Sequence, residues 1–158
     1  MSEQSLKNKL KKDLAHDFYI LEEISGYHPI YDQKVRIDFM FKAKSHLVNS
    51  GFTDGWFGIE CKWIKGLGGQ TSKTTKMVWQ SITDAQSIFE IEGKKITPKF
   101  IAVFTPDNLE KQIAEHLKTL LSLALYGNVG QLYFYSDGTG VLSLLLFIVG
   151  AIQILVTM

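Results

Sequence analysis

Only one cysteine, Cys61, is present in the 158 residues of this chain. A single thiol cannot form an internal disulfide, and the first residues, MSEQSLKNKLKKDL, contain no apolar core of the kind found in secretory signal peptides. These absences exclude the class of small secreted domains that are held together by disulfides. We therefore expect an intracellular protein in a reducing compartment, the cytoplasm.

Histidines are also few, and nothing in their spacing suggests a zinc site. The spacing of His16, His28, His46 and His116, among themselves or from Cys61, does not follow a metal-ligand pattern. We therefore expect no metal site built from cysteine and histidine. The segment GLGGQTSKTT likewise lacks the spacing of a nucleotide-binding P-loop, which excludes that class of site.

The chain has almost no net charge, with a formal value of +1 at pH 7. Charge alone therefore indicates no strong attraction to nucleic acid. Charged residues make up 21% of the chain and hydrophobic residues 46%, a balance typical of a folded protein rather than a disordered one. The length fits one domain, which we expect to span residues 1–158.

Charged residues are absent from the C-terminal segment Gly138 to Met158, in which residues 141–158 form a run of 18 mostly apolar positions. That length is at the lower limit for a membrane-spanning helix. Gly150 and Gln153 interrupt the run, β-branched residues are frequent, and no cluster of lysine or arginine flanks it. A buried strand or strand pair is therefore favoured, with a small membrane-associated protein as the alternative.

Hydrophobic periodicity divides the chain into helices and strands. Apolar residues recur every three or four positions from about residue 5 to 24, which predicts an amphipathic helix, and they alternate from about 27 to 42, which predicts a strand region. Further strands are expected within 56–64, 99–105, 131–136 and 141–149, and further helices at about 74–91 and 107–128. The predicted order is α-β-β-β-α-β-α-β-β, in one α/β domain with a central mixed β-sheet flanked by helices.

The segment GWFGIECKW, from Gly55 to Trp63, places two charges inside an apolar strand. With a period of two, the apolar side chains fall on one face and Glu60 and Lys62 share the other. A lone carboxylate, Asp38, interrupts the preceding apolar strand, VRIDFMF, and lies on the same face if the two strands are neighbours. Partly shielded carboxylates repel each other, and a divalent cation such as Mg²⁺ removes that cost. From the residues alone, a metal site and a solvated ion pair both remain open.

The arrangement VRIDF, a connecting loop and then FGIECKW resembles the signature of the PD-(D/E)XK nuclease superfamily. Asp38 matches the motif aspartate, Glu60 the second acid and Lys62 the lysine, whereas Ile37 stands where the motif has its proline. The resemblance covers about Ser5 to Thr105. It implies a restriction-endonuclease-like fold, with an αβββαβ core and extra C-terminal strands.

The resemblance also implies a mechanism. Asp38 and Glu60 would bind Mg²⁺, for which Mn²⁺ can substitute, and the backbone carbonyl of Cys61 would complete the protein ligands. Lys62 would hold or deprotonate the attacking water. The implied substrate is DNA, cut by an endonuclease rather than an exonuclease. A homodimer or higher homo-oligomer is implied as well, because small domains of this kind commonly need a second subunit to cut two strands.

Supporting residues follow from the same resemblance. Several branches of the superfamily have a glutamate on the first helix near the metal, here Glu22 or Glu23, for which a solvated helix end is the alternative. Others have a glutamine on the helix after the lysine, here Gln80, with Gln86 as a second candidate. Phosphate contacts are expected from three lysines in or after the loop that follows the motif, or else these lysines only solvate it: Lys65, Lys73 and Lys76.

A second function class stays open beside the nuclease. A non-catalytic nucleic-acid-binding or interaction domain could keep the same fold without the chemistry. The complete set of Asp38, Glu60 and Lys62 favours the enzyme, because loss of activity in such folds is usually accompanied by loss of one of these residues. A membrane is not an expected partner.

Overall fold

The computed structural model describes residues 2–64, 70–106, 109–124, 128–136, 142–147 and 154–157, and from residue 133 onward it describes the backbone alone. The helices are α1 (Glu3–Leu14), α2 (Ser45–Asn49), α3 (Gln70–Ala85) and α4 (Lys111–Ala124). The strands are β1 (Phe18–His28), β2 (Gln33–Ala43), β3 (Trp56–Cys61), β4 (Ile88–Ile91), β5 (Lys94–Ile96), β6 (Ile101–Phe104), β7 (Val129–Ser136), β8 (Leu142–Phe147) and β9 (Ile154–Thr157).

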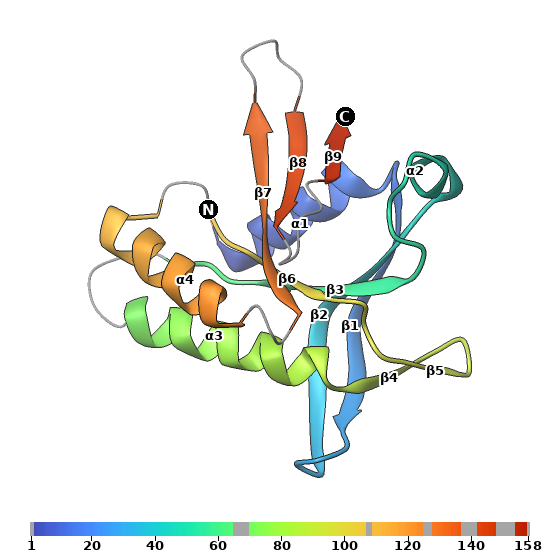
Figure 1. The fold of residues 1–158 in the computed structure, drawn as a ribbon, viewed down its shortest axis with the longest axis horizontal. Coiled ribbons are helices and arrows are strands. Elements are labelled where there is room, and N and C mark those ends of the chain that lie inside the picture. The colour runs from blue at the N-terminus through green and yellow to red at the C-terminus, as the bar shows by residue number, and fades with distance from the viewer. Residues whose placement is uncertain are drawn as a thin grey trace.

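Within these ranges the strands form one mixed sheet, in the order β5-β4-β1-β2-β3-β6-β7-β8-β9 (Figure 1). Strands β3, β6 and β7 are parallel, and the other neighbouring pairs are antiparallel. Parallel neighbours need a crossover connection, which α3 supplies between β3 and β6 and α4 between β6 and β7. The prediction of an α/β protein with a mixed sheet flanked by helices is confirmed.

Helices cover both faces of the sheet, and each face has its own apolar cluster. Helix α1 begins at a capping box, in which the Ser2 hydroxyl accepts the backbone N–H of Ser5, and buries Leu6, Leu10 and Leu14 against one face. Helices α3 and α4 lie side by side and bury their apolar stripes against the other face (Figure 1). The site described below lies where β2 and β3 meet α3.

The predicted helix from residue 5 to 24 is wrong in its second half. Helix α1 ends at Leu14, and the apolar residues Phe18 and Leu21, which continue its spacing, lie on β1. Strand β1 pairs with β2 along almost its whole length, from Phe18 opposite Ala43 to His28 opposite Gln33. The backbone hydrogen bonds of this hairpin outweigh a helical pattern that continues by coincidence for two turns.

The helix predicted at 74–91 is also too long at its C-terminal end. Helix α3 ends at Ala85, and residues 88–91 form β4, which pairs with β1 and with β5. The connection between β2 and β3, expected to be without regular structure, contains the short helix α2. The predicted element order therefore lacks the helix α2, the β4–β5 hairpin and the last strand, β9, and it assigns most of β1 to the first helix.

The uncharged C-terminal segment forms strands in the residues that are described, as predicted, at 142–147 and 154–157. They extend the sheet beyond β7. Among the helices of the described ranges, none is both long and apolar enough to span a membrane.

Gly58 on β3 has no room for a side chain, and we expect its replacement by alanine to destabilise the fold. A Cβ at this position would overlap the terminal methyl groups of Ile37 and Ile101, both fully buried. Overpacking of this kind costs about 1–3 kcal/mol. Urea unfolding measures the loss for Gly58→Ala. Adding Ile37→Val and Ile101→Val removes the two overlapping methyl groups and should recover part of the loss. Equal stability of Gly58→Ala and wild type would contradict this packing.

Candidate metal centre

Asp38 and Glu60 lie on the neighbouring antiparallel strands β2 and β3, one position beyond the paired residues Phe39 and Ile59. Each carboxylate accepts a backbone N–H from the other strand. The N–H of Asp38 donates to Oε2 of Glu60 at 3.1 Å, and the N–H of Cys61 donates to Oδ2 of Asp38 at 2.9 Å. The two acids are therefore locked to one another by the sheet itself, as the alternation of the sequence predicted.

Glu60 is only 7% exposed, and burial together with the nearby Asp38 carboxylate raises its pKa to about 8. The hydrogen bond from the Asp38 backbone lowers the pKa of Glu60, but not enough to compensate. At neutral pH Glu60 therefore takes up a proton when no metal ion is bound to the pair. The pair resists holding two negative charges.

Gln80 reaches this pair from α3, where its side-chain amide donates to Oε1 of Glu60. The predicted glutamine thus contacts a predicted metal-binding acid. The other candidate, Gln86, lies beyond the end of α3, and its side-chain oxygen is hydrogen-bonded to Nε2 of His28 at 3.1 Å. Of the two glutamines, the structure brings only Gln80 to the site.

The ammonium group in contact with Asp38 belongs to Lys7 of α1, not to Lys62. Lys7 donates to Oδ1 of Asp38, and its Nζ lies 3.4 Å from Oε1 of Glu23. Burial alone would lower the pKa of Lys7, but the two carboxylates outweigh burial and raise it above its ordinary value. Lys62 instead lies with its Nζ 3.6 Å from Oε2 of Glu3, with its side chain 40% exposed.

The sequence contained a signal for Lys7, but the neighbouring lysines of the N-terminal segment obscured it. The N-terminal lysines resemble an ordinary solvated helix face, but Lys7 directly follows Leu6 and precedes Leu10 by three positions, so it borders the buried stripe. A lysine in that position can extend its stem along the apolar surface and reach a buried carboxylate.

Glu22 and Glu23 lie on β1, so their prediction on the first helix is wrong. Oε1 of Glu22 accepts a hydrogen bond from Lys11 at 2.6 Å on the exposed surface, away from the two acids. Glu23 is nearer to the site, because it pairs with Lys7 and, at 3.0 Å, with Arg36. Its backbone has a φ of 54°, and the β1–β2 ladder skips this residue opposite Asp38.

Asp84 is a further acid of the site, and the sequence analysis did not identify it. It follows Gln80 by one turn of α3 and is 1% exposed, and its Oδ2 has no hydrogen-bond partner among the residues that the structure describes. Burial, with a smaller effect of Asp38, raises its pKa to about 7. Its spacing of four from Gln80 was the available signal, since residues i and i+4 share one helix face.

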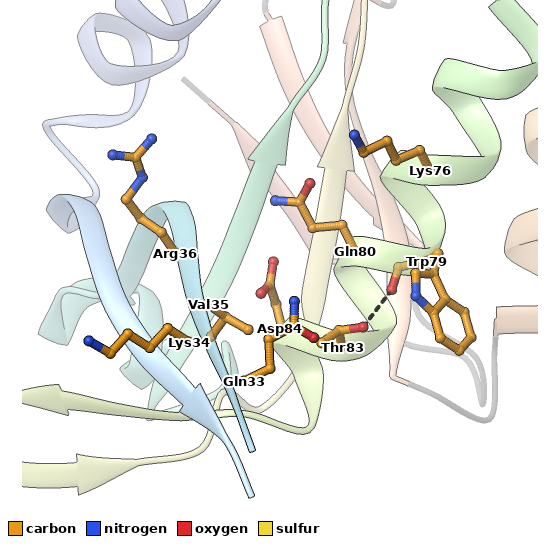
Figure 2. A pocket seen from close by; sticks show the side chains of 9 residues that line it. All are labelled: Gln33, Lys34, Val35, Arg36, Lys76, Trp79, Gln80, Thr83 and Asp84. Carbon is orange, nitrogen blue, oxygen red and sulfur yellow. Dashed lines mark hydrogen bonds between the residues drawn. The ribbon is translucent and has the colours of Figure 1, made fainter. Parts of the chain in front are cut away.

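A pocket of about 280 Å³ opens beside these acids, between β2 and α3 (Figure 2). Gln80 and Asp84 extend from α3 toward β2, whereas the side chains of Lys34 and Arg36, which also line the pocket, extend from β2 away from α3 (Figure 2). The remaining lining residues are Gln33, Val35, Lys76, Trp79 and Thr83. The lining thus includes one buried acid, Asp84, and three basic residues, Lys34, Arg36 and Lys76, and Gln80 joins it to Glu60.

Of the three lysines predicted to contact phosphate, Lys76 lines this pocket. Lys73 is exposed on α3 one turn before it. Lys65 lies outside the described residues. Cys61, predicted to act through its backbone, is 2% exposed, and burial raises the pKa of its thiol far above the ordinary value. Its side chain packs in the α1-side cluster, and its N–H holds Asp38.

The raised pKa values of Glu60 and Asp84 predict how the metal-free protein responds to pH. In the unfolded chain these groups titrate near 4.5 and 3.8, and in the folded protein near 8 and 7. Between these limits the folded state binds more protons, so their contribution to stability is complete at low pH and is lost as the pH rises toward 8. Urea unfolding in EDTA from pH 5 to 9 should show this decline, and Glu60→Gln should flatten it. A wild-type curve no steeper than that of Glu60→Gln would contradict the assignment.

Searches of protein-family models, of curated proteins and of solved structures each found no match to this chain. The function proposed below therefore depends on the geometry of the site and on the motif in the sequence.

Proposed function

We propose that this protein is a Mg²⁺-dependent nuclease that hydrolyses phosphodiester bonds in DNA. The observation that supports it best is the interlocked pair of Asp38 and Glu60, held by each other's strands in a place where two negative charges are unfavourable. A pair of acids fixed in this way has a physical use for a divalent cation. An ordinary ion pair on a solvated face would show neither the burial nor the interlock.

The donor set fits Mg²⁺ or Mn²⁺. Asp38 and Glu60 supply hard carboxylate oxygens, and the main chain at Cys61 lies beside them, as the motif requires. A cation bound there would lower the pKa of a coordinated water and offset charge on the phosphoryl oxygens. The buried thiol of Cys61 disfavours thiol chemistry, because a thiolate is the reactive form and burial suppresses it here.

The chain's own side chains divide the remaining work. Gln80 holds Oε1 of Glu60 and so fixes the rotamer of that carboxylate. Lys7 holds Asp38 and neutralises it when no metal is bound. Lys62 is the lysine of the motif, and its exposed pair with Glu3 at 3.6 Å is weak enough to be exchanged for a water or a phosphate. We assign to Lys62 the role of holding and deprotonating the attacking water.

The order of elements supports a restriction-endonuclease-like fold as part of this proposal. When the short α2 and the β4–β5 hairpin are taken as additions, the elements α1, β1, β2, β3, α3 and β6 follow the order αβββαβ. The motif acids lie on the second and third strands of that core, and Gln80 lies on its second helix. Strands β7 to β9 would be the extra C-terminal strands.

The pocket between β2 and α3 is the proposed path for DNA. Lys34, Arg36 and Lys76 are among its lining residues and can neutralise phosphates, while Gln80, also in the lining, donates a hydrogen bond to Glu60. One such site cuts one strand, so cutting duplex DNA would need a second copy of the chain, and we include a homodimer or higher oligomer in the proposal. Internal cleavage is favoured over cleavage from an end, as the motif implies.

One observation favours the non-catalytic alternative. Lys7 already neutralises Asp38 without a metal, while the ammonium group of Lys62 lies on Glu3. A domain that only binds nucleic acid would use the same basic residues of the pocket, and Asp38 and Glu60 would serve only to hold β2 and β3 together. Cleavage assays separate these two functions.

Substitutions at the site should separate metal binding from proton transfer. Asp38→Asn and Lys62→Met should each lower cleavage of labelled circular single-stranded and linear DNA in Mn²⁺ by about 100-fold or more, the range for loss of an acid–base group. Lys7→Met should remain active and need less Mn²⁺, because no ammonium competes for Asp38. The exposed Glu90→Gln is the control, and thermal melting verifies the fold.

Three outcomes of these assays would overturn the assignment. Wild-type protein that binds DNA but never cuts it, with either metal, would establish the non-catalytic alternative. Normal cleavage by Lys62→Met together with loss in Lys7→Met would transfer the chemical role to α1. Cleavage that continues in EDTA would exclude the metal site.

The basic residues that line the pocket predict how DNA affinity depends on salt concentration. The double variant Lys34→Gln with Lys76→Gln should weaken DNA binding in EDTA and reduce the slope of log K against log salt by about 2, because each lysine neutralises about one phosphate. Lys111→Gln with Lys118→Gln removes the same charge from the exposed face of α4 and is the matched control. Fluorescence anisotropy at about 50 to 200 mM salt measures the DNA affinity and its salt slope for both double variants. Equal slopes in the two double variants would place the DNA elsewhere.

A further inference from the structure

A second group of ionisable side chains lies at the opposite end of the β1–β2 hairpin from its tip. His16 and Asp17 occupy the connection between α1 and β1, and His46 lies in α2, directly after β2. Oδ1 of Asp17 lies 2.8 Å from Nδ1 of His16 and 2.7 Å from Nε2 of His46. The three potential ligand atoms all lie within 4.8 Å of one another.

The sheet fixes this grouping, although His16 and His46 are far apart in the sequence. Phe18 pairs with Ala43 at the start of the hairpin, and the backbone N–H of Lys44 donates to the carbonyl of Asp17 at 3.0 Å. The side chain of Asp17 is 9% exposed, whereas those of His16 and His46 are 88% and 48% exposed. A buried carboxylate is thus held between two imidazoles that face solvent.

We propose that His16, Asp17 and His46 form a binding site for a borderline divalent transition metal, with Zn²⁺ as the ion of best fit. Two imidazole nitrogens and one carboxylate oxygen are a common ligand set for zinc, with a solvent molecule in the fourth position. The site differs in kind from the oxygen-only pair of Asp38 and Glu60, since imidazole selects Zn²⁺ over Mg²⁺.

Only small movements would convert the present hydrogen bonds into ligation. In a tetrahedral zinc site with bonds of about 2.0–2.1 Å, neighbouring ligand atoms lie about 3.3 Å apart. The two nitrogens would therefore each retreat from Asp17 by about half an ångström, and, since they lie within 4.8 Å of one another, they would also have to settle at that spacing from each other. Exposed side chains such as His16 and His46 can make these movements. Asp17 is held in place by its backbone bonds and need not move.

The site is independent of the proposed nuclease centre. Asp38 lies five residues from Ala43 along β2, about 16 Å at about 3.3 Å per residue, and its carboxylate contacts Lys7 and the backbone of Cys61 rather than α2. Bound zinc would tie the end of α1 to α2 and so close the base of the hairpin. The expected effect is structural, a clip between two connections that are otherwise joined by the hydrogen bond between Asp17 and His46 and by two bonds from Lys44, to the backbone carbonyls of Asp17 and Ala15.

Zinc binding by the untagged full-length chain tests the proposal, since an affinity tag would itself bind the metal. After EDTA treatment and its removal, isothermal titration with Zn²⁺ at pH 7.5 should give one site per chain, and zinc should raise the melting temperature. In the variant His16→Gln with His46→Gln, zinc affinity should fall by more than about tenfold. Removing a residue that only hydrogen-bonds to a metal ligand already costs about that much, and here two ligands themselves are removed.

Two controls make the result specific. His116→Gln removes a histidine that contacts Thr75 on the other face of the sheet and should leave zinc binding unchanged. Asp38→Asn alters the nuclease centre and should also leave it unchanged. Zinc binding that survives in the His16→Gln, His46→Gln variant, that is lost in Asp38→Asn, or that is absent in the wild type would overturn the proposal. None of these outcomes depends on whether the protein cuts DNA.

Discussion

The carboxylates of Asp38 and Glu60 each accept a backbone N–H from the opposite strand, and this exchange ties the chemistry of the site to the register of the sheet. Both bonds can form only in this register, so the pair helps to define how β2 and β3 align. A slip of one residue would turn Glu60 toward the α1 side and bury it among phenylalanines. The fold and the site therefore depend on the same alignment.

Positive charge reaches the two acids by different routes. Asp38 is matched by the ammonium group of Lys7, which comes from the opposite layer of the molecule, and Glu60 is matched by a proton, as its pKa of about 8 indicates. Both forms of compensation are easily exchanged, because a lysine side chain can rotate away and a proton can leave to solvent. Asp84 is a third acid near this pair, and its own pKa is raised to about 7. The group of acids therefore favours any cation that can replace the lysine and the protons.

Much of this arrangement follows from local sequence, and the rest required the tertiary structure. Alternation in VRIDFMF and GWFGIECKW was enough to place Asp38 and Glu60 on one face once the strands were taken as neighbours, and the resemblance to the nuclease motif pointed to Gln80 on the following helix. The first helix was predicted too long because Phe18 and Leu21 keep its period by chance, and no local rule shows that β1 gains more by pairing with β2. The position of Lys7 beside the buried stripe was visible in the sequence, but its partner Asp38 was not, and neither was the grouping of Asp17 with His46, since each pair lies about 30 residues apart.

The two proposed metal sites, one at Asp38 and Glu60 and one at His16, Asp17 and His46, differ in chemistry, and that difference has a consequence for metal selection. An oxygen-only pair does not by itself favour Mg²⁺ over Zn²⁺, because transition metals bind most ligand sets more tightly. Imidazole ligands bind zinc far better than they bind magnesium. Zinc at low concentration would therefore fill the group at His16 and His46 before the acids at Asp38 and Glu60. The hard-oxygen site would be left to the more abundant hard cation, for which water and phosphate remain the preferred partners.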